Sequence, residues 1–98
     1  MKLLKGKVCV ITGAGKGFGY DLSMRYQELG AKLALITRSQ ADIKKLHKVF
    51  GTENADVLIF QGDVSHQDEA KNFVDATEKQ FTNVDVLVNN AGMRFRKP

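Results

Sequence analysis

A glycine-rich turn directly behind an apolar run constrains the fold of this 98-residue chain more than any other segment. The run Lys7-Val8-Cys9-Val10-Ile11 is typical of a buried strand, and the turn that follows it is Thr12-Gly13-Ala14-Gly15-Lys16-Gly17-Phe18-Gly19. Beyond the turn, apolar side chains recur at helical spacing, at Phe18, Leu22, Tyr26 and Leu29. A strand that passes through such a turn into a helix is the first unit of a fold in which parallel strands alternate with helices.

The same alternation continues along the chain. We expect strands at 7–12, 32–37, 56–61 and 84–88, and helices over 17–29, 40–50 and 66–81. Gly30 and Gly51 follow the first two helices, at a place where glycine is favoured. Ser39 is placed to cap the second helix, and Ser65 with Asp68 resembles a capping box for the third.

Apolar spacing predicts which helix faces are buried. The second helix carries its inner face at Ile43, Leu46 and Phe50, and the third at Ala70, Phe73, Val74, Thr77 and Phe81. The fold class is therefore α/β, with a parallel sheet and helices on both of its faces. We expect a truncated Rossmann-type sheet with strand order 3-2-1-4, in which residues 1–98 form one incomplete half-domain.

In that strand order, two glycine-containing loops, 13–19 and 89–92, emerge at the carboxyl ends of neighbouring strands. Gly13, Gly17 and Gly19 match neither the strict G-x-G-x-x-G nor the nucleoside-triphosphate P-loop. Glycines at a strand-to-helix turn still allow a tight turn, close approach to a pyrophosphate and close helix packing. A turn without a ligand is the alternative, and the second loop favours a dinucleotide site.

The residues after the second strand bear on which dinucleotide binds. An NAD site usually has a carboxylate on the ribose 2′-hydroxyl there, whereas this chain has Thr37-Arg38-Ser39. Arg38 can pair with a 2′-phosphate through its planar fork, and Lys16 can reach the same phosphate from the glycine loop. NADP(H) is therefore expected in preference to NAD(H). The alternative is that both side chains are merely exposed cations.

Two further segments are candidates for the same site. Asp63 and Val64 follow the third strand, where a carboxylate can accept from the adenine amino group and an apolar side chain can line the ring. Asp63 can equally accept from donors of its own loop, and the two roles are compatible. Asn90, Ala91 and Gly92 bring small backbone against a cofactor, while an asparagine side chain ties neighbouring strands together.

Charge and composition exclude several other classes. The net charge of +4 weakly favours an anionic ligand, but the cations are dispersed, so no nucleic-acid partner is expected. The densest basic group, residues 44–48, is interpreted as a solvated helix face. No stretch approaches the roughly 20 apolar residues of a membrane span. Lys5 and Lys7 interrupt any signal-peptide core, so we expect a cytoplasmic protein without a membrane partner.

The reactive side chains give little sign of chemistry of their own. Cys9, the single cysteine, lies on the apolar first strand and is interpreted as a small buried hydrophobe. His47 and His66 stand alone on predicted helix surfaces. Together with Cys9 they lack metal-ligand spacing, so no metal site is expected.

These motifs together resemble the short-chain dehydrogenase/reductase family. The resemblance rests on Thr12-Gly13-x-x-x-Gly17-x-Gly19, on Asp63-Val64 and on Asn89-Asn90-Ala91-Gly92, which occur in the family's order. It implies that the loop from Gly13 through Gly15, Gly17 and Phe18 to Gly19 holds the pyrophosphate and the adenosine ribose. It further implies an NADP-type site at Lys16 and Arg38, adenine at Asp63 and Val64, and ribose nearer the nicotinamide at Asn90, Ala91 and Gly92.

The chain also departs from the family. Its members carry a catalytic Ser and a Tyr-x-x-x-Lys, whereas Tyr20 and Tyr26 here are followed four residues later by Met24 and Gly30. We therefore expect no catalytic residue in this chain, which is interpreted as the cofactor-binding piece of an oxidoreductase acting on a carbonyl or an alcohol. A small-molecule substrate is then expected only for a full-length form. The alternatives are a non-catalytic nucleotide-binding module and a protein that associates, for example as a homo-oligomer, through an open sheet edge.

Overall fold

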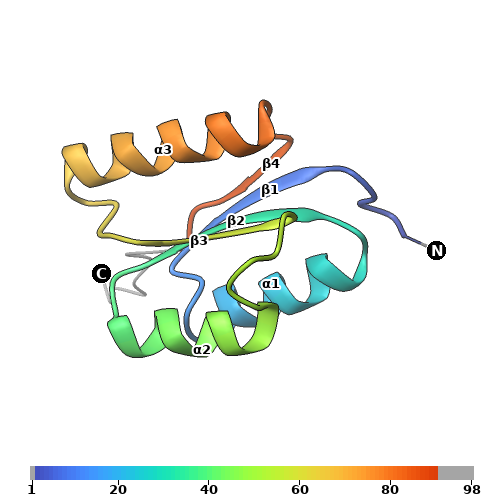
Figure 1. Cartoon of the computed structure of the whole chain (residues 1–98), viewed down its shortest axis with the longest axis horizontal. Helices are drawn as coiled ribbons and strands as arrows, with labels where there is room; N and C mark the ends of the chain where they lie inside the picture. Colours follow the sequence, from blue (N-terminus) through green and yellow to red (C-terminus); the bar gives the residue numbers. More distant parts are fainter. Residues whose placement is uncertain (1, 91–98) are drawn as a thin grey trace, which may run out of the picture.

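Four parallel strands form one sheet in this computed structural model, which describes residues 2–90. In chain order, the elements are β1 (Val8–Thr12), α1 (Gly17–Glu28), β2 (Lys32–Thr37), α2 (Gln40–Phe50), β3 (Val57–Gln61), α3 (Gln67–Phe81) and β4 (Val86–Val88). The spatial order is β3-β2-β1-β4, and every neighbouring pair is parallel, as expected. Helices α1 and α2 lie on one face of the sheet and α3 lies on the other, so the Rossmann-type arrangement is confirmed (Figure 1).

The sheet is buried on both faces only at its centre. On β2, Leu33 and Leu35 belong to the core beneath α1 and α2, whereas Ala34 and Ile36 belong to the core beneath α3. The alternation follows from the pleat, which sends successive side chains to opposite faces. All four side chains are at most 1% exposed, and they explain why β2 reads as an uninterrupted apolar run.

The two cores differ in size. The larger core contains Cys9, Ile11, Ala14, Ala31, Leu33, Leu35, Leu46, Phe50 and Val57. The smaller core contains Val10, Ala34, Ile36 and Phe73, and the Phe73 ring packs against that of Phe60 with centroids 5.5 Å apart. Two helices thus cover one face and a single helix covers the other.

Strand ends differ slightly from the sequence-based expectation. Residues 84 and 85 were expected in the fourth strand, but β4 begins at Val86. The reason is that the Asp85 carboxylate accepts from the backbone N–H of Val8 at 2.9 Å, while the Asp85 N–H donates to the Val8 carbonyl. A side chain thereby replaces one backbone partner at the start of the strand. The first and third strands likewise begin one residue later than expected.

The helix ends test the capping predictions. Ser39 caps α2, since its hydroxyl accepts from the Asp42 N–H at 3.3 Å. Gly30 and Gly51 follow α1 and α2 with φ of 91° and 88°, as expected of glycine after a helix. The capping box at Ser65 is wrong: His66 is the N-cap of α3, and Ser65 instead donates to Asp63.

Two apolar side chains lie outside the faces predicted for them. Phe18 is 62% exposed, because a side chain in the first turn of a helix points back past the helix end. Val74 is 50% exposed, because the buried stripe of α3 runs through Phe73 and Thr77 and the next residue is rotated by about 100°. Leu46 and Phe50 of α2 are buried as predicted, and Ile43 is half-buried.

Cys9 is an ordinary buried side chain of the core. Cys9 is fully buried, and burial together with the nearby Asp85 charge raises the pKa of its thiol.

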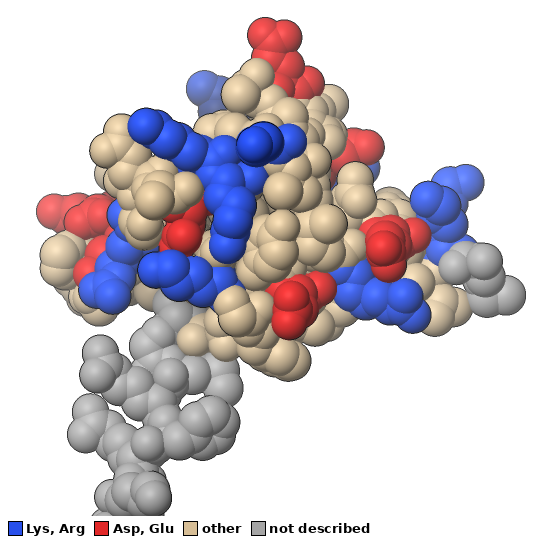
Figure 2. Space-filling model, turned by 90° about the horizontal axis from the view of Figure 1, so that it is seen from below, with Lys and Arg blue, Asp and Glu red and all other residues tan. Residues whose placement is uncertain are grey.

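Figure 2 shows Lys and Arg side chains spread over the side that bears α1 and α2, with acidic side chains between them. On that side, the Lys45 ammonium lies 4.3 Å from the centre of the Tyr20 ring, which joins α2 to α1. Among residues 2–90, no helix has both the length and the apolar character needed to cross a bilayer.

The burial pattern predicts a large difference between two leucines of the sheet. Leu35→Ala should lower the free energy of unfolding by about 2–5 kcal/mol, because Leu35 is fully buried at the centre of the sheet. Leu87→Ala is the matched control and should cost about 0.5 kcal/mol, because Leu87 is 65% exposed on β4. Urea unfolding of both variants measures the difference. Equal costs would contradict the assigned core.

Candidate functional site

A pocket of about 630 Å³ opens at the carboxyl end of the sheet. Its volume is in the range of small-molecule and cofactor sites. It brings together side chains and backbone from the loops that follow all four strands, and its lining is Gly13, Lys16, Ile36, Thr37, Arg38, Ser39, Asp42, Gly62, Asp63, Val64, Ser65, Asn89 and Asn90.

The loop between β1 and α1 adopts backbone that suits glycine at two positions. Gly13 has φ of 62° and Gly17 has φ of 54°, which lie in the left-handed region that L side chains rarely adopt. A Cβ added at Gly17 would meet nothing within 4 Å. The backbone at Gly17 is therefore open to the approach of another group.

Gly15 and Gly19 are required for a different reason, which is close packing. A Cβ at Gly19 would overlap the Gly13 carbonyl and lie 2.7 Å from the side-chain nitrogen of Asn90. A Cβ at Gly15 would overlap the side chain of Asp42 on α2. Both glycines therefore draw neighbouring elements against the loop.

The start of α1 lacks the acidic residues that α2 and α3 carry in their first turns, and, like α3, it has no side-chain cap. No side chain caps it, and its first turn has no acidic residue. By contrast, Ser39 caps α2, whose first turn carries Asp42. The first turn of α3 carries Asp68 and Glu69. The amide groups and the positive dipole end of α1 are thus left to an anionic ligand.

Hydrogen bonds join the end of β1 to the loop after β4. The Thr12 hydroxyl donates to the side-chain oxygen of Asn89 at 3.1 Å and accepts from the Asn90 N–H at 2.8 Å. The Asn90 amide in turn donates to the Gly13 carbonyl at 3.3 Å. These contacts hold the two loops side by side. The sequence-based prediction that an asparagine side chain links neighbouring strands is therefore confirmed.

Each of the two predicted cations has a carboxylate beside it. Lys16 lies 3.7 Å from the Asp42 carboxylate, and Arg38 lies 3.7 Å from that of Asp63. The two cationic side chains are about three-quarters exposed, at 75% and 76%. Their carboxylate partners are far less exposed, at 11% for Asp42 and 23% for Asp63, so an anion that binds either cation competes with the carboxylate beside it.

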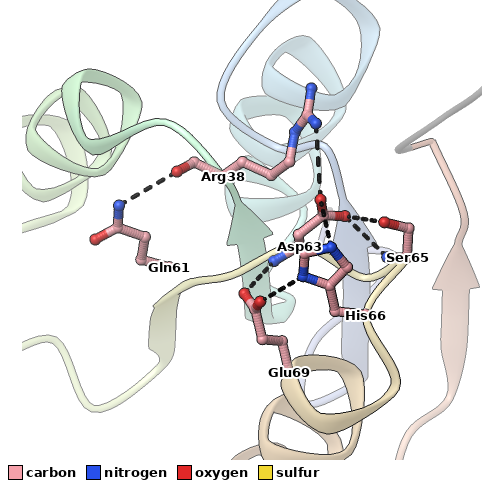
Figure 3. A network of polar contacts seen from close by, with 6 residues as sticks. All are labelled: Arg38, Gln61, Asp63, Ser65, His66 and Glu69. Carbon is pink, nitrogen blue, oxygen red and sulfur yellow. Dashed lines mark hydrogen bonds and ion pairs between the residues drawn. The ribbon is translucent and has the colours of Figure 1, made fainter.

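Asp63 is the centre of a polar network at the end of β3 (Figure 3). One of its oxygens accepts from the N–H and the hydroxyl of Ser65, at 2.9 and 2.7 Å. The other lies 3.7 Å from Arg38 and 3.9 Å from the His66 ring. Glu69 completes the network, with one oxygen on the Asp63 N–H at 2.8 Å and the other 2.7 Å from His66.

The network shifts the pKa values of its members. The pKa of His66 is raised above 6.5, first by the hydrogen bond between His66 and Glu69 and then by the Asp63 charge. The Ser65 hydroxyl and N–H, in that order, hold the pKa of Asp63 below 3.8. The hydrogen bond from His66 and then the Asp63 N–H lower the pKa of Glu69 below 4.5. The alternating charges of Arg38, Asp63, His66 and Glu69 therefore support one another.

Six predicted site residues line the pocket: Gly13, Lys16, Arg38, Asp63, Val64 and Asn90. Gly15 and Gly19 are buried behind it, and Gly17 and Phe18 lie exposed beside it at the start of α1. Ala91 and Gly92 fall outside the described residues.

The pocket also contains residues that were not predicted as part of the site. The most important is Asp42, a buried carboxylate on the first turn of α2. A signal for it was present, because an acidic residue about 20 positions past the glycine loop is a feature of dinucleotide sites. The sequence-based prediction rested on residues 37–39, whereas Asp42 lies further along, in α2. Gly62 and Ser65, which flank the predicted Asp63 and Val64, also line the pocket.

The two histidines are not equivalent, although both were predicted to stand alone on helix surfaces. His66 belongs to the Asp63 network, so the prediction is wrong for it. His47 is half-buried on α2, and its Nδ1 is a buried polar atom for which residues 2–90 provide no hydrogen-bond partner.

The Asp63 network predicts a defined pH dependence of stability. The stabilisation from charged His66 is complete below its ordinary pKa of 6.5 and is lost as pH rises through the raised value. The stabilisation from Glu69 is present above 4.5 and is lost as pH falls through the lowered value. The network therefore contributes most between these two values. In urea unfolding, the wild type should exceed His66→Gln in stability by more at about pH 5.5 than at about pH 8.5. A gap independent of pH would contradict this assignment.

Comparison with known proteins agrees with this geometry. The short chain dehydrogenase family model matches residues 7–98. An 11-beta-hydroxysteroid dehydrogenase-like protein of Arabidopsis thaliana is 41% identical over 92 residues, which is 90% of this chain and 29% of that protein. The chain thus spans less than a third of the length of this relative.

Two solved structures resemble the fold closely. The NADP-bound C-domain of a bacterial malonyl-CoA reductase superposes with a TM-score of 0.79 at 29% identity, covering 94% of this chain and 16% of the other. A 3-ketoacyl-(acyl-carrier-protein) reductase from Brucella melitensis, complexed with NADH, gives a TM-score of 0.75 at 32% identity, covering 85% and 33%. With the family match over nearly its whole length, this chain belongs to the short-chain dehydrogenase/reductase family.

Proposed function

We propose that this chain is the cofactor-binding portion of an NADP(H)-dependent oxidoreductase that acts on a carbonyl or alcohol substrate. The observation that carries the proposal is the convergence of an uncapped helix start with Lys16 and Arg38 around one pocket. A dinucleotide phosphate carries negative charge at both its pyrophosphate and its 2′-phosphate. The pocket offers positive partners of two kinds, amide groups and exposed cations.

The residues present fit the pyrophosphate. The backbone at Gly17, where an added Cβ would meet no protein atom within 4 Å, and the start of α1 would form a cradle for it. The loop from Gly13 to Gly19 would hold the pyrophosphate there, with Gly15 and Gly19 shaping the loop from behind. Phe18, exposed in the first turn of α1, would border the adenosine ribose.

The residues after β2 and β3 fit the adenosine end. Arg38 and Lys16 would hold the 2′-phosphate, which their exposed side chains are free to reach. Asp63 would accept from the adenine amino group, and Val64, which lines the pocket, would contact the ring. Asn90, with Ala91 and Gly92, would border the ribose nearer the nicotinamide. Relatives in complex with NADP and with NADH support a dinucleotide and leave the preference between the two to experiment.

Arg38→Gln tests the preference for NADP(H). Loss of an exposed charge-assisted contact should weaken NADPH binding by about threefold to tenfold and change NADH binding by less than about twofold. Fluorescence titration of the bound reduced nicotinamide measures both affinities. Arg25→Gln on α1 is the matched control, because Arg25 is exposed, pairs with Glu28 and lies outside the pocket. Equal losses for NADPH and NADH, or a wild type that binds NADH more tightly, would contradict the role of Arg38.

The whole-protein activity is a separate part of the proposal. The family's reaction requires a Ser and a Tyr-x-x-x-Lys, and the sequence contains no Tyr-x-x-x-Lys. We expect the 98-residue chain to bind NADPH but to oxidise it no faster than buffer does in the presence of a panel of carbonyl compounds. Absorbance at the reduced-nicotinamide band measures the rate. Clear turnover would mean that other residues replace the tyrosine and the lysine.

A second candidate role, association through the sheet edge, rests on β4. Leu87 is 65% exposed and Val84 is 48% exposed beside the outermost strand. An apolar edge with unpaired backbone groups favours pairing with another chain. Sedimentation of the chain with and without NADPH separates the two roles, because a strictly monomeric chain that binds NADPH would contradict association.

A further inference from the structure

Asp42 is a buried carboxylate that the proposed cofactor contacts leave unused. It lies in the first turn of α2, is 7% exposed and lines the pocket. Its N–H donates to the Ser39 hydroxyl, and one oxygen of its carboxylate lies 3.7 Å from the Lys16 ammonium. Aspartate side chains are rarely buried unless they are paired.

The fold keeps this carboxylate against the glycine loop. The side chain of Asp42 packs so closely on Gly15 that a Cβ at that position would overlap it. Gly15 directly precedes Lys16, so the loop that carries the lysine and the helix that carries the aspartate meet at this contact. Lys16 is 75% exposed at its side chain, whereas the side chain of Asp42 is 11% exposed. The anion is therefore the fixed member of the pair and the cation is the movable one.

The pair lies where the proposed function needs positive charge. Asp42, Lys16 and Arg38 line the same pocket, and the lysine that a 2′-phosphate would attract already has an anion beside it. A 2′-phosphate must compete with Asp42 for Lys16, whereas an uncharged 2′-hydroxyl need not. A hydroxyl can instead donate to a carboxylate.

We propose that Asp42 is a specificity-determining residue that lowers the preference of this pocket for the 2′-phosphate by holding Lys16, so that NAD(H) is bound as well as NADP(H). This inference rests on the proposed function, since it concerns the same pocket and the same cofactors. It assigns to a residue of α2 an effect opposite to that of Arg38. The balance between Arg38 and Asp42 then sets how strongly the two dinucleotides are distinguished.

The acidic residue also has a structural role that the test must separate. An aspartate in the first turn of a helix is stabilised by the helix dipole, and α2 gains from it in any case. Asp68 lies in the first turn of α3, outside the pocket and exposed, and carries the same charge near a helix N-terminus. Asp68→Asn is therefore the matched control for Asp42→Asn, with an identical change in net charge.

The experiment measures the affinities of the 98-residue chain for NADPH and NADH by fluorescence titration. Asp42→Asn should raise the ratio of NADPH affinity to NADH affinity by roughly three- to tenfold, as expected for release of a partly buried ion pair. Asp68→Asn should leave the ratio within about twofold of the wild type. Added salt should reduce the effect of Asp42→Asn, because the 2′-phosphate contact is screened.

A double-mutant cycle with Lys16→Met tests whether Asp42 acts through the lysine. In the Lys16→Met background, Asp42→Asn should change the ratio by less than about twofold. An undiminished effect there would overturn the proposal that the ion pair carries the discrimination. A ratio that stays unchanged or falls in Asp42→Asn with Lys16 present would overturn it as well, because Asp42 would then be neutral or would orient Lys16 toward the phosphate.

Two further results keep the test decisive. Circular dichroism and urea unfolding check that each variant is folded, and Asp42→Ser removes the same charge if the asparagine variant does not fold. A wild-type chain that binds neither dinucleotide contradicts the proposed function itself. A wild-type chain that binds both, with a ratio indifferent to Asp42, contradicts only this further inference.

Discussion

The contact on which the site depends is the close approach of Gly19 to the end of β1. Because Gly19 has no side chain, the first turn of α1 lies directly against the Gly13 carbonyl and the Asn90 amide. Thr12 then joins the loops after β1 and β4 through its hydroxyl. These contacts lie at the carboxyl end of the sheet, and they bring the uncapped start of α1 to the position where a parallel sheet of this order binds its ligands.

Charge at this site is arranged in pairs rather than as a positive patch. Lys16 has Asp42 beside it, and Arg38 has Asp63. Each exposed cation thus forms an ion pair with a less exposed carboxylate from a different part of the chain. An anion that binds Lys16 or Arg38 must compete with these carboxylates, whereas one that binds the amide groups at the start of α1 need not. The His66 ring also lies 3.9 Å from the Asp63 carboxylate, and Glu69 accepts from the Asp63 N–H, whereas within residues 2–90 Lys16 is the one cation paired with Asp42.

Much of the fold was predictable because its signals are local. The apolar run of β2, the glycines after α1 and α2, and the Ser39 cap each depend on residues near one another in the sequence, and the structure confirms them. Two of the failures, at β4 and at the start of α3, share one cause, which is competition from another polar partner. Asp85 takes the Val8 amide and shortens β4, and Asp63 takes Ser65 away from the start of α3. A sequence pattern does not show which of two polar partners prevails.

The sequence by itself determined the strand order and the place of the glycine loop, because hydrophobic periodicity and right-handed crossovers leave few arrangements for alternating strands and helices. It also determined that Lys16, Arg38 and Asp63 would meet, since each follows a strand of a parallel sheet. Only the tertiary structure decided which carboxylate each cation faces. Asp42 lies on the first turn of a helix rather than at a strand end, and it reaches Lys16 only because Gly15 lets α2 pack against the loop.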